Sequence, residues 1–396
     1  MKHSTTDTTF TPASLVGTLI GSLALVATNV YAMNGAQLGG YGIKNAGMGG
    51  ASIALPLDAS AAANNPAGMA FVPTSIAANL VSFKGQSSVN LFGNALEDNT
   101  TVLAPEGGFN YVLSPNMTIG LTLSGQGAGV DFGKPAVPVP GADNVKASQK
   151  VAEFSNSVTW KIQPNFAVGL GLIYMVQQVD TQGVVVQPVP GMFVPIPSHG
   201  TQTATGFGAR VGMLWNASPE FSLGATYKTK TNMSKLGDYA NDILAYSEGK
   251  IDIPSEYGVG FAWKATPAVT LAADYLLVEY SVVKANQDPN GPGWKDQPIF
   301  RLGASWDVDS TWTLRGGLSS NKGQIESSRT AQNFMTPAIN DKSYTFGATM
   351  KLDKASDISF SLEMNPSVTL DGSGPSTGAS ITSKTQVFRV GYQKAF

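Results

Sequence analysis

The sequence predicts an all-β fold, a transmembrane antiparallel β-barrel of about 14 strands with an N-terminal plug, or hatch, in its lumen. Three observations support this prediction. Apolar residues alternate with small or polar ones along most of the chain beyond residue 75, short and long connections succeed one another, and the glycine-rich stretch before the first strand does not alternate. A period of two is typical of strands.

Composition excludes several other classes of protein. Only 13% of the 396 residues are charged and 44 are glycine, which is unusual for a soluble globular protein. Beyond residue 32 no apolar run approaches the roughly 18 residues that a membrane helix needs. A net charge of -2 without a basic cluster excludes nucleic acid as a partner, and the lack of cysteine excludes disulfides and thiolate metal sites. The sequence predicts no cofactor and no metal.

Residues 1–32 have the features of a secretory signal peptide. Lys2 stands near the start, an apolar stretch runs from Leu15 to Ala27, and Val30-Tyr31-Ala32 has the small-x-small form of a cleavage site. The mature chain is therefore expected to begin at Met33, and the alternative is an uncleaved anchor. Export of the protein also fits the absence of cysteine.

The alternating segments have one apolar face and one face of glycine, serine, threonine and charged residues. A β-sandwich core could not bury those charges without pairing them. An arginine turned to lipid costs about 2–4 kcal/mol at the bilayer midplane. The pattern therefore predicts a barrel with the apolar face toward lipid. The charged residues predicted to face the lumen are Arg210, Lys228, Asp274, Arg301, Asp307, Arg315, Glu363 and Arg389.

The connections predict the number of strands and their orientation. Six short turns and seven long loops require about fourteen strands, with both ends on the periplasmic side. Aromatic residues such as Trp215 and Trp263 stand beside the short turns, as expected for a girdle at the membrane surface. The terminal Phe396 resembles the sorting signal of outer-membrane barrels. Short turns are predicted near 114–116, 163–165, 217–219, 265–267, 308–310 and 353–355, and long loops near 85–99, 131–146, 180–200, 233–248, 284–296, 323–341 and 371–380.

Residues 33–73 form the predicted hatch, and residues 74–396 the predicted barrel. The segment is rich in glycine and other small residues, so it cannot build a core of its own, and it is too irregular to face lipid. The lumen of the barrel is the remaining place for it.

Two motifs in this segment, GIKNAGMGG at Gly42–Gly50 and DASAAANNPAGMA from Asp58, resemble the FadL/TodX family of outer-membrane transporters. The likeness continues in IPSEYGVGFAWKATPAVTLAADY from Ile253, in PIFRLGASWDVDSTWTLRGGLS from Pro298 and in Tyr344–Gly347. It covers the mature chain, and the Asn-Pro-Ala element of the hatch is its most specific part.

The resemblance implies a hatch-closed barrel with an external hydrophobic groove, an internal pocket and a lateral opening through the wall. It implies passive transport of hydrophobic small molecules across the outer membrane of a Gram-negative bacterium. Long-chain fatty acids are the leading cargo, and aromatic or other hydrocarbons are the alternative. By position, Asp58 and the segment Asn65, Pro66, Ala67 and Gly68 would form the hatch kink whose movement opens the path. Pro66, which lacks an N–H, could also be an ordinary turn stop.

The residues themselves suggest two kinds of contact with cargo. A cargo carboxylate in the lumen would be bound best by arginine. The alternation of the strands predicts that Arg210, Arg315 and Arg389 face inward. Each of them could instead form a lumenal ion pair. The apolar loop residues Met192, Phe193 and Val194 are candidates for the external groove, although lid packing would also explain them.

Other functional classes fit less well. Gly374–Gly378 spells a GxSxG string, but it lies in a polar loop, and the mature chain has one histidine, His199, so an enzyme such as an outer-membrane lipase is not expected. A general porin would not need a plug, and an adhesin would have longer, more charged loops. The expected partners are a hydrophobic small molecule and outer-membrane lipid, and the barrel is expected to be a monomer.

Overall fold

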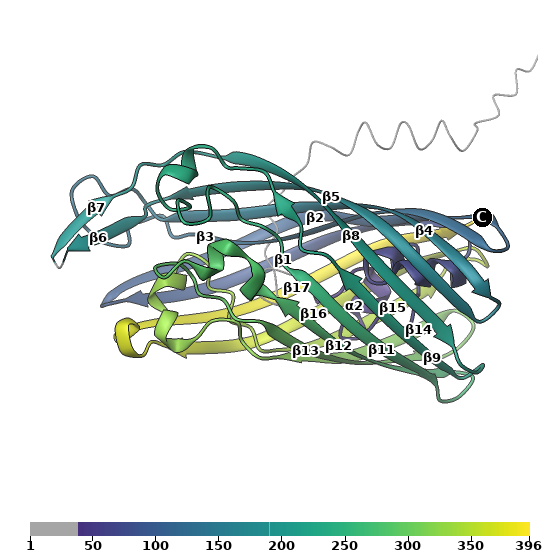
Figure 1. The fold of residues 1–396 in the computed structure, drawn as a ribbon. Helices are drawn as coiled ribbons and strands as arrows, with labels where there is room; N and C mark the ends of the chain where they lie inside the picture. The colour runs from purple at the N-terminus through teal and green to yellow at the C-terminus, as the bar shows by residue number, and fades with distance from the viewer. Residues whose placement is uncertain (1–38, 190) are drawn as a thin grey trace, which may run out of the picture.

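The computed structural model describes residues 39–189 and 191–396, so the predicted signal peptide and residues 33–38 of the predicted hatch lie outside the described residues. In the described part, 14 strands form one closed antiparallel barrel, which confirms the predicted fold class (Figure 1). These strands are β1 (Ser75–Leu91), β2 (Asn94–Ser114), β3 (Met117–Asp131), β4 (Lys146–Gln163), β5 (Phe166–Gln182), β8 (Gln202–Asn216), β9 (Phe221–Lys228), β11 (Ser255–Lys264), β12 (Val269–Glu279), β13 (Gln297–Asp307), β14 (Trp312–Asn321), β15 (Lys342–Lys351), β16 (Ser356–Asp371) and β17 (Ala379–Ala395).

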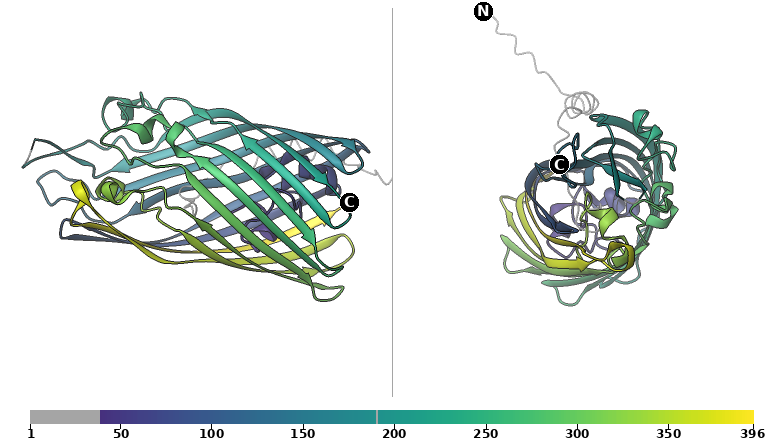
Figure 2. Two further views of the ribbon diagram at one scale, coloured as in Figure 1. Left: turned by 60° about the horizontal axis from the view of Figure 1, so that its bottom comes forward. Right: turned by 90° about the vertical axis from the view of Figure 1, so that its left-hand side faces the viewer.

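The barrel closes by pairing its first strand with its last. Ser75 of β1 lies opposite Ala395 of β17, and the Phe396 N–H donates to the Thr74 carbonyl at 2.9 Å. Both ends of the barrel therefore lie at the rim that carries the short turns, as the even strand number predicted. Figure 2 shows the ring of strands end-on, with the hatch inside it.

The remaining elements are short. β10 (Asn232–Met233) pairs with β8, and β6 (Val185–Val189) and β7 (Met192–Pro195) form a separate hairpin. No helix in residues 39–189 and 191–396 is long and apolar enough to cross a membrane. The helices are α2 (Ile43–Ala46), η1 (Ala61–Ala63), η2 (Pro66–Phe71), η3 (Asp238–Asn241), η4 (Tyr280–Val282), η5 (Lys284–Gln287), η6 (Ser327–Arg329), η7 (Ala331–Asn333) and η8 (Gly374–Ser376).

The two faces of the strands are arranged as the alternation predicted. The large apolar side chains point outward and are exposed, for example Phe207 at 74% and Leu302 at 50%. The inward positions are buried and include Arg210, Asp274 and Arg389. The wall therefore presents an apolar surface to lipid and encloses these three charges. Asp307, which was also predicted to face the lumen, lies at the end of β13 beside a short turn and is exposed.

One predicted loop is wrong. Residues 85–99 belong to β1 and β2, which continue as a hairpin and turn at Phe92 and Gly93. Both turn residues have positive φ, 54° and 96°, as two-residue hairpin turns require. Polar residues on the outward face of these strand ends obscured the apolar alternation. The other predicted long loops lie between strands as expected.

Candidate functional site

The hatch occupies the end of the lumen near the short turns, and almost all of residues 39–73 are buried. It packs directly against wall glycines. A Cβ on Gly303 would overlap the backbone of Met48, and one on Gly317 would overlap the backbone nitrogen of Gly49. The inward wall positions that a Cβ could not occupy without touching the hatch include Gly108, Gly120, Gly169, Gly212, Gly224, Gly258, Gly260, Gly303, Gly317 and Gly347. Much of the glycine content of the barrel therefore serves close packing of backbone on backbone.

Wall side chains hold backbone N–H groups of the hatch. Asp274 Oδ2 accepts from the N–H groups of Ser52 and Ile53 at 2.7 and 3.1 Å. Glu106 Oε1 accepts from the Gly42 N–H at 2.7 Å. These bonds satisfy hatch donors that would otherwise be buried without a partner, so they fix the hatch in the lumen.

Asn65 ties the predicted kink to the wall. Its Nδ2 donates to the carbonyl oxygens of Ile53 at 2.8 Å and Met213 at 3.0 Å, and its Oδ1 accepts from the Ala67 N–H. Pro66 follows as the first residue of η2, where its missing N–H costs nothing. Asn65, Pro66, Ala67 and Gly68 are thus both a helix start and a wall contact, and their role as a gate stays a prediction.

Asp58 lies elsewhere in the hatch. Its Oδ1 accepts from the Ser60 N–H at 2.8 Å. Burial raises the pKa of Asp58, and the nearby Lys44 ammonium partly opposes this shift. Lys44 itself forms an ion pair with Asp357 of the wall at 2.7 Å.

Replacing Asn65 by alanine is expected to loosen the hatch. The change removes the donor from the buried Ile53 carbonyl oxygen and from the partly buried Met213 carbonyl oxygen, which costs about 1–3 kcal/mol. We expect faster proteolysis of the hatch in the folded protein, with Asn290→Ala in an exposed loop as the control. Equal digestion rates in the two variants would show that Asn65 does not hold the hatch.

The inward arginines have partners within the protein. Arg210 lies 3.8 Å from both Glu153 and Glu256, and its Nη1 donates to the Asn64 carbonyl of the hatch at 3.3 Å. Lys228 forms ion pairs with the same two glutamates.

The other two candidates also have internal partners. Arg389 pairs with Glu363 at 3.3 Å, and Arg315 Nη1 donates to Thr349 Oγ1 at 2.6 Å. The proposed contact of Arg210, Arg315 and Arg389 with a cargo carboxylate stays a prediction, and it would compete with these bonds.

A cavity of about 180 Å³ lies under the long loops at the opposite end of the barrel. Its lining is mainly apolar and contains two aspartates but neither lysine nor arginine. Gln126 and Gly127 of β3 also line it, so the cavity reaches the barrel wall. The apolar residues that line it are Val151, Ile243, Leu244, Ile251, Ile253, Pro254, Tyr280, Val283, Ala285, Pro292 and Trp294.

Met192, Phe193 and Val194 lie on β7 of the separate hairpin, which projects beyond the rest of the barrel (Figure 1). Their side chains are exposed, and they do not line the 180 Å³ cavity. A role of this hairpin in an external groove stays a prediction.

The hydrogen-bond ladder between β2 and β3 is incomplete. It runs from Ser114 opposite Met117 to Gly107 opposite Leu123, and then it stops. Beyond that point residues 94–106 pair with β1 alone and residues 124–131 with β4 alone. A small cavity of about 30 Å³ lies here, lined by Thr100 and Ala128 among others. The wall therefore contains a gap between two strand edges that share no ladder bonds, beside the β3 residues that line the 180 Å³ cavity. The gap ends where the Asp131 N–H donates to Asp98 Oδ1 at 3.2 Å.

Two features of the sequence mark this gap. Pro105 lies within β2, and proline is confined to strand edges because it cannot donate to a ladder. Gly125, Gly127 and Gly129 occupy the outward positions of β3, so β3 itself contributes no side chain to the lipid side of the gap. These signals were available in the sequence and were missed.

Ser376 of the GxSxG string and His199 have separate hydrogen-bond partners. Ser376 Oγ donates to the Ser328 carbonyl at 2.9 Å, within its own group of loops. His199 Nε2 lies 2.6 Å from Asp242 Oδ2 and its ring packs edge-on against Tyr239. These partners are those of loop packing.

Solved structures of similar fold cover almost the whole chain. The toluene transporter TodX of P. putida matches with a TM-score of 0.71 at 17% identity, over 91% of this chain and 99% of that one. The toluene transporter TbuX of Ralstonia pickettii matches with a TM-score of 0.68 at 17% identity, over 90% and 99%. A Pseudomonas aeruginosa FadL homologue gives 0.69 at 17% identity, over 91% and 100%.

Sequence comparison identifies the family. No curated protein matches the chain by sequence. The model of the family described as outer membrane protein transport protein (OMPP1/FadL/TodX) matches residues 23–396. The predicted resemblance is thereby confirmed, and so is location in the outer membrane of a Gram-negative bacterium. The chain belongs to the OMPP1/FadL/TodX family of outer-membrane transport proteins, which are channels for hydrophobic compounds.

Proposed function

We propose that this protein is a passive channel that takes hydrophobic small molecules from the cavity beneath its loops and releases them sideways into the membrane through the gap between β2 and β3. The observation that supports the proposal is the position of the gap. It borders Gln126 and Gly127, which line the 180 Å³ cavity, while the buried hatch fills the lumen below. A straight aqueous path is therefore blocked, which also argues against a general porin.

Such a route needs no energy source. Transfer of an apolar molecule from water into an apolar cavity gains about 0.8 kcal/mol per buried methylene, and the lipid beyond the gap offers the same gain. The cavity can bind apolar molecules in this way because its lining is mainly apolar. The concentration gradient alone would then drive net movement.

The lining of the cavity favours an uncharged cargo. A fatty acid brings a carboxylate, which is best held by arginine or lysine. The lining contains neither, and its charged members are Asp252 and Asp288. Aromatic or other hydrocarbons therefore fit the cavity better than long-chain fatty acids. Fatty acids stay the second candidate, because Arg210 lies deeper in the lumen and its bonds to two glutamates are long.

Uptake by cells that lack a transporter of their own separates these cargoes. We expect the intact protein to accelerate entry of labelled toluene more than entry of a labelled long-chain fatty acid. The reverse preference would assign fatty acids as cargo. Ion conduction in a planar bilayer without uptake of either would support a porin instead.

A charge placed in the cavity is expected to block uptake. Leu244→Asp buries a carboxylate without a cationic partner among apolar side chains. Tyr246→Asp on the same loop is the control, because Tyr246 is 45% exposed and does not line the cavity. Loss of hydrocarbon uptake should be confined to Leu244→Asp. If both variants transport normally, cargo does not pass through this cavity.

We also infer that the barrel works as a monomer surrounded by outer-membrane lipid. Its sheet is closed by the pairing of β1 with β17. A closed sheet leaves few free edges to pair with another copy.

A further inference from the structure

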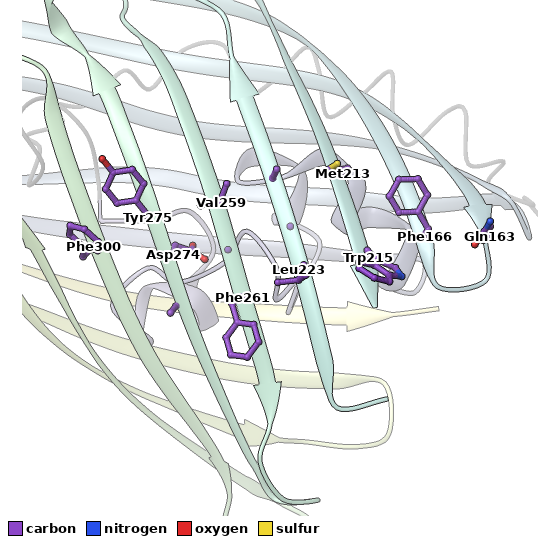
Figure 3. A pocket seen from close by; sticks show the side chains of 14 residues that line it. Gln163, Phe166, Met213, Trp215, Leu223, Val259, Phe261, Asp274, Tyr275 and Phe300 are labelled. Atoms are coloured by element: carbon purple, nitrogen blue, oxygen red, sulfur yellow. The ribbon is translucent and has the colours of Figure 1, made fainter. Parts of the chain in front are cut away.

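A larger cavity, of about 790 Å³, lies on the outer face of the wall (Figure 3), and no residue of β2 or β3 lines it. It forms a groove across β8, β9, β11 and β12, with further lining from β4, β5 and β13. The side chains that line it are mostly outward-facing and apolar, and they include Met213, Trp215, Leu223, Phe261 and Tyr275. We refer to it as the wall groove.

Two alanines in the row of large outward residues make the wall groove hollow. Ala225 lies between Met213 and Val259 on the neighbouring strands. Ala273 lies between Phe261 and Leu302 in the same way. The missing side-chain volume at these two positions leaves a depression between bulky neighbours.

The floor of the wall groove is one backbone layer thick. Gly224 and Gly260 lie in this layer, and a Cβ on Gly224 would sit 2.5 Å from the carbonyl oxygen of hatch residue Ile53. Asp274 also lines the groove. One of its oxygens holds the hatch, while Oδ1 is buried and makes no hydrogen bond among the described residues. Whatever fills the groove therefore packs against the wall that supports the hatch.

We propose that the wall groove binds an acyl chain of a membrane phospholipid. The groove is continuous with the outward apolar face that contacts lipid, so hydrocarbon is the solvent that covers it. Its volume lies within the range of roughly 300–1,000 Å³ typical of small-molecule sites. Trp215 and Trp263, beside the short turns, place it at the periplasmic half of the membrane. This proposal rests on the location in the membrane and not on the proposed transport route.

A photoreactive phospholipid tests the proposal. The intact protein is reconstituted in lipid nanodiscs containing a phosphatidylethanolamine with a diazirine in one acyl chain, and labelled peptides are mapped by mass spectrometry. We expect residues 213–225 and 257–275 to carry more label than the outward face of β15 and β16. Ala225→Phe and Ala273→Phe, which fill the groove, should remove most of this excess. Ala348→Phe, at an outward position on β15 outside the groove, should leave it unchanged.

Three results would overturn the proposal. Uniform labelling around the barrel would show that the groove has no preference for a lipid chain. Excess label that persists in both groove-filling variants would show that it arises elsewhere. Displacement of the label by free toluene at a concentration that leaves labelling of β15 unchanged would assign the groove to cargo. Folding of each variant is checked first by its heat-dependent migration in detergent gels.

Discussion

Uptake through this barrel is expected to stop when the gap between β2 and β3 is closed by a covalent bridge. Thr100 and Ala128 lie on opposite sides of the gap and line the same small cavity of about 30 Å³. Both occupy inward positions of their strands. The protein has no cysteine of its own, so in Thr100→Cys/Ala128→Cys the new pair is the only disulfide that can form. Oxidation should reduce hydrocarbon uptake to the background of cells without the protein.

The same preparation provides its own control. Reduction of the bridge should restore uptake, and neither single cysteine variant should respond to oxidation. Formation of the bridge is followed by loss of free thiol, and a short bis-maleimide replaces the disulfide if the two sulfur atoms do not reach each other. Normal uptake by fully bridged protein would mean that cargo leaves by another route, and lateral release at this gap would be abandoned.

The barrel was predictable because its signal is local. A strand with lipid on one side and a packed lumen on the other must alternate between apolar and small or polar residues. Each membrane-spanning strand can therefore be recognised from its own sequence. The hairpin of β1 and β2 escaped prediction where it rises above the membrane. There the outward positions, such as Lys84, Gln86 and Ser88, face water and the apolar alternation is lost.

The candidate site was less predictable because it depends on pairing between distant segments. The alternation along its strand predicted that Arg210 faces inward. Its partners Glu153 and Glu256 come from β4 and β11, so alternation within one strand could not predict them. The position of the gap depends on where the ladder between β2 and β3 stops. The two-residue period of apolar residues shows which residues form a strand but not which strands pair along their whole length. Pro105 within β2 and the run of outward glycines in β3 were its only local signs.

The position of the hatch in the lumen is expected to depend on single wall glycines. Two adjacent glycines of β14 provide a matched test. Gly317 faces the lumen, where an added Cβ would overlap the backbone of Met48 and Gly49. Gly316 faces outward, and its nearest neighbour would be the Thr345 carbonyl oxygen at 3.9 Å. Gly317→Ala should therefore displace the hatch, at a cost of about 1–3 kcal/mol for overpacking, whereas Gly316→Ala should leave it in place.

Conductance in a planar bilayer and susceptibility of the hatch to protease report this displacement directly. For Gly317→Ala we expect ion conductance above that of the intact protein, because a displaced hatch opens the lumen to water, together with faster cleavage within residues 39–73. Gly303→Ala, which meets the backbone of Met48, should behave in the same way. Conductance that is equally low in Gly316→Ala and Gly317→Ala would mean that the hatch adapts to the wall. The close packing of backbone on glycine would then not be what holds the lumen closed.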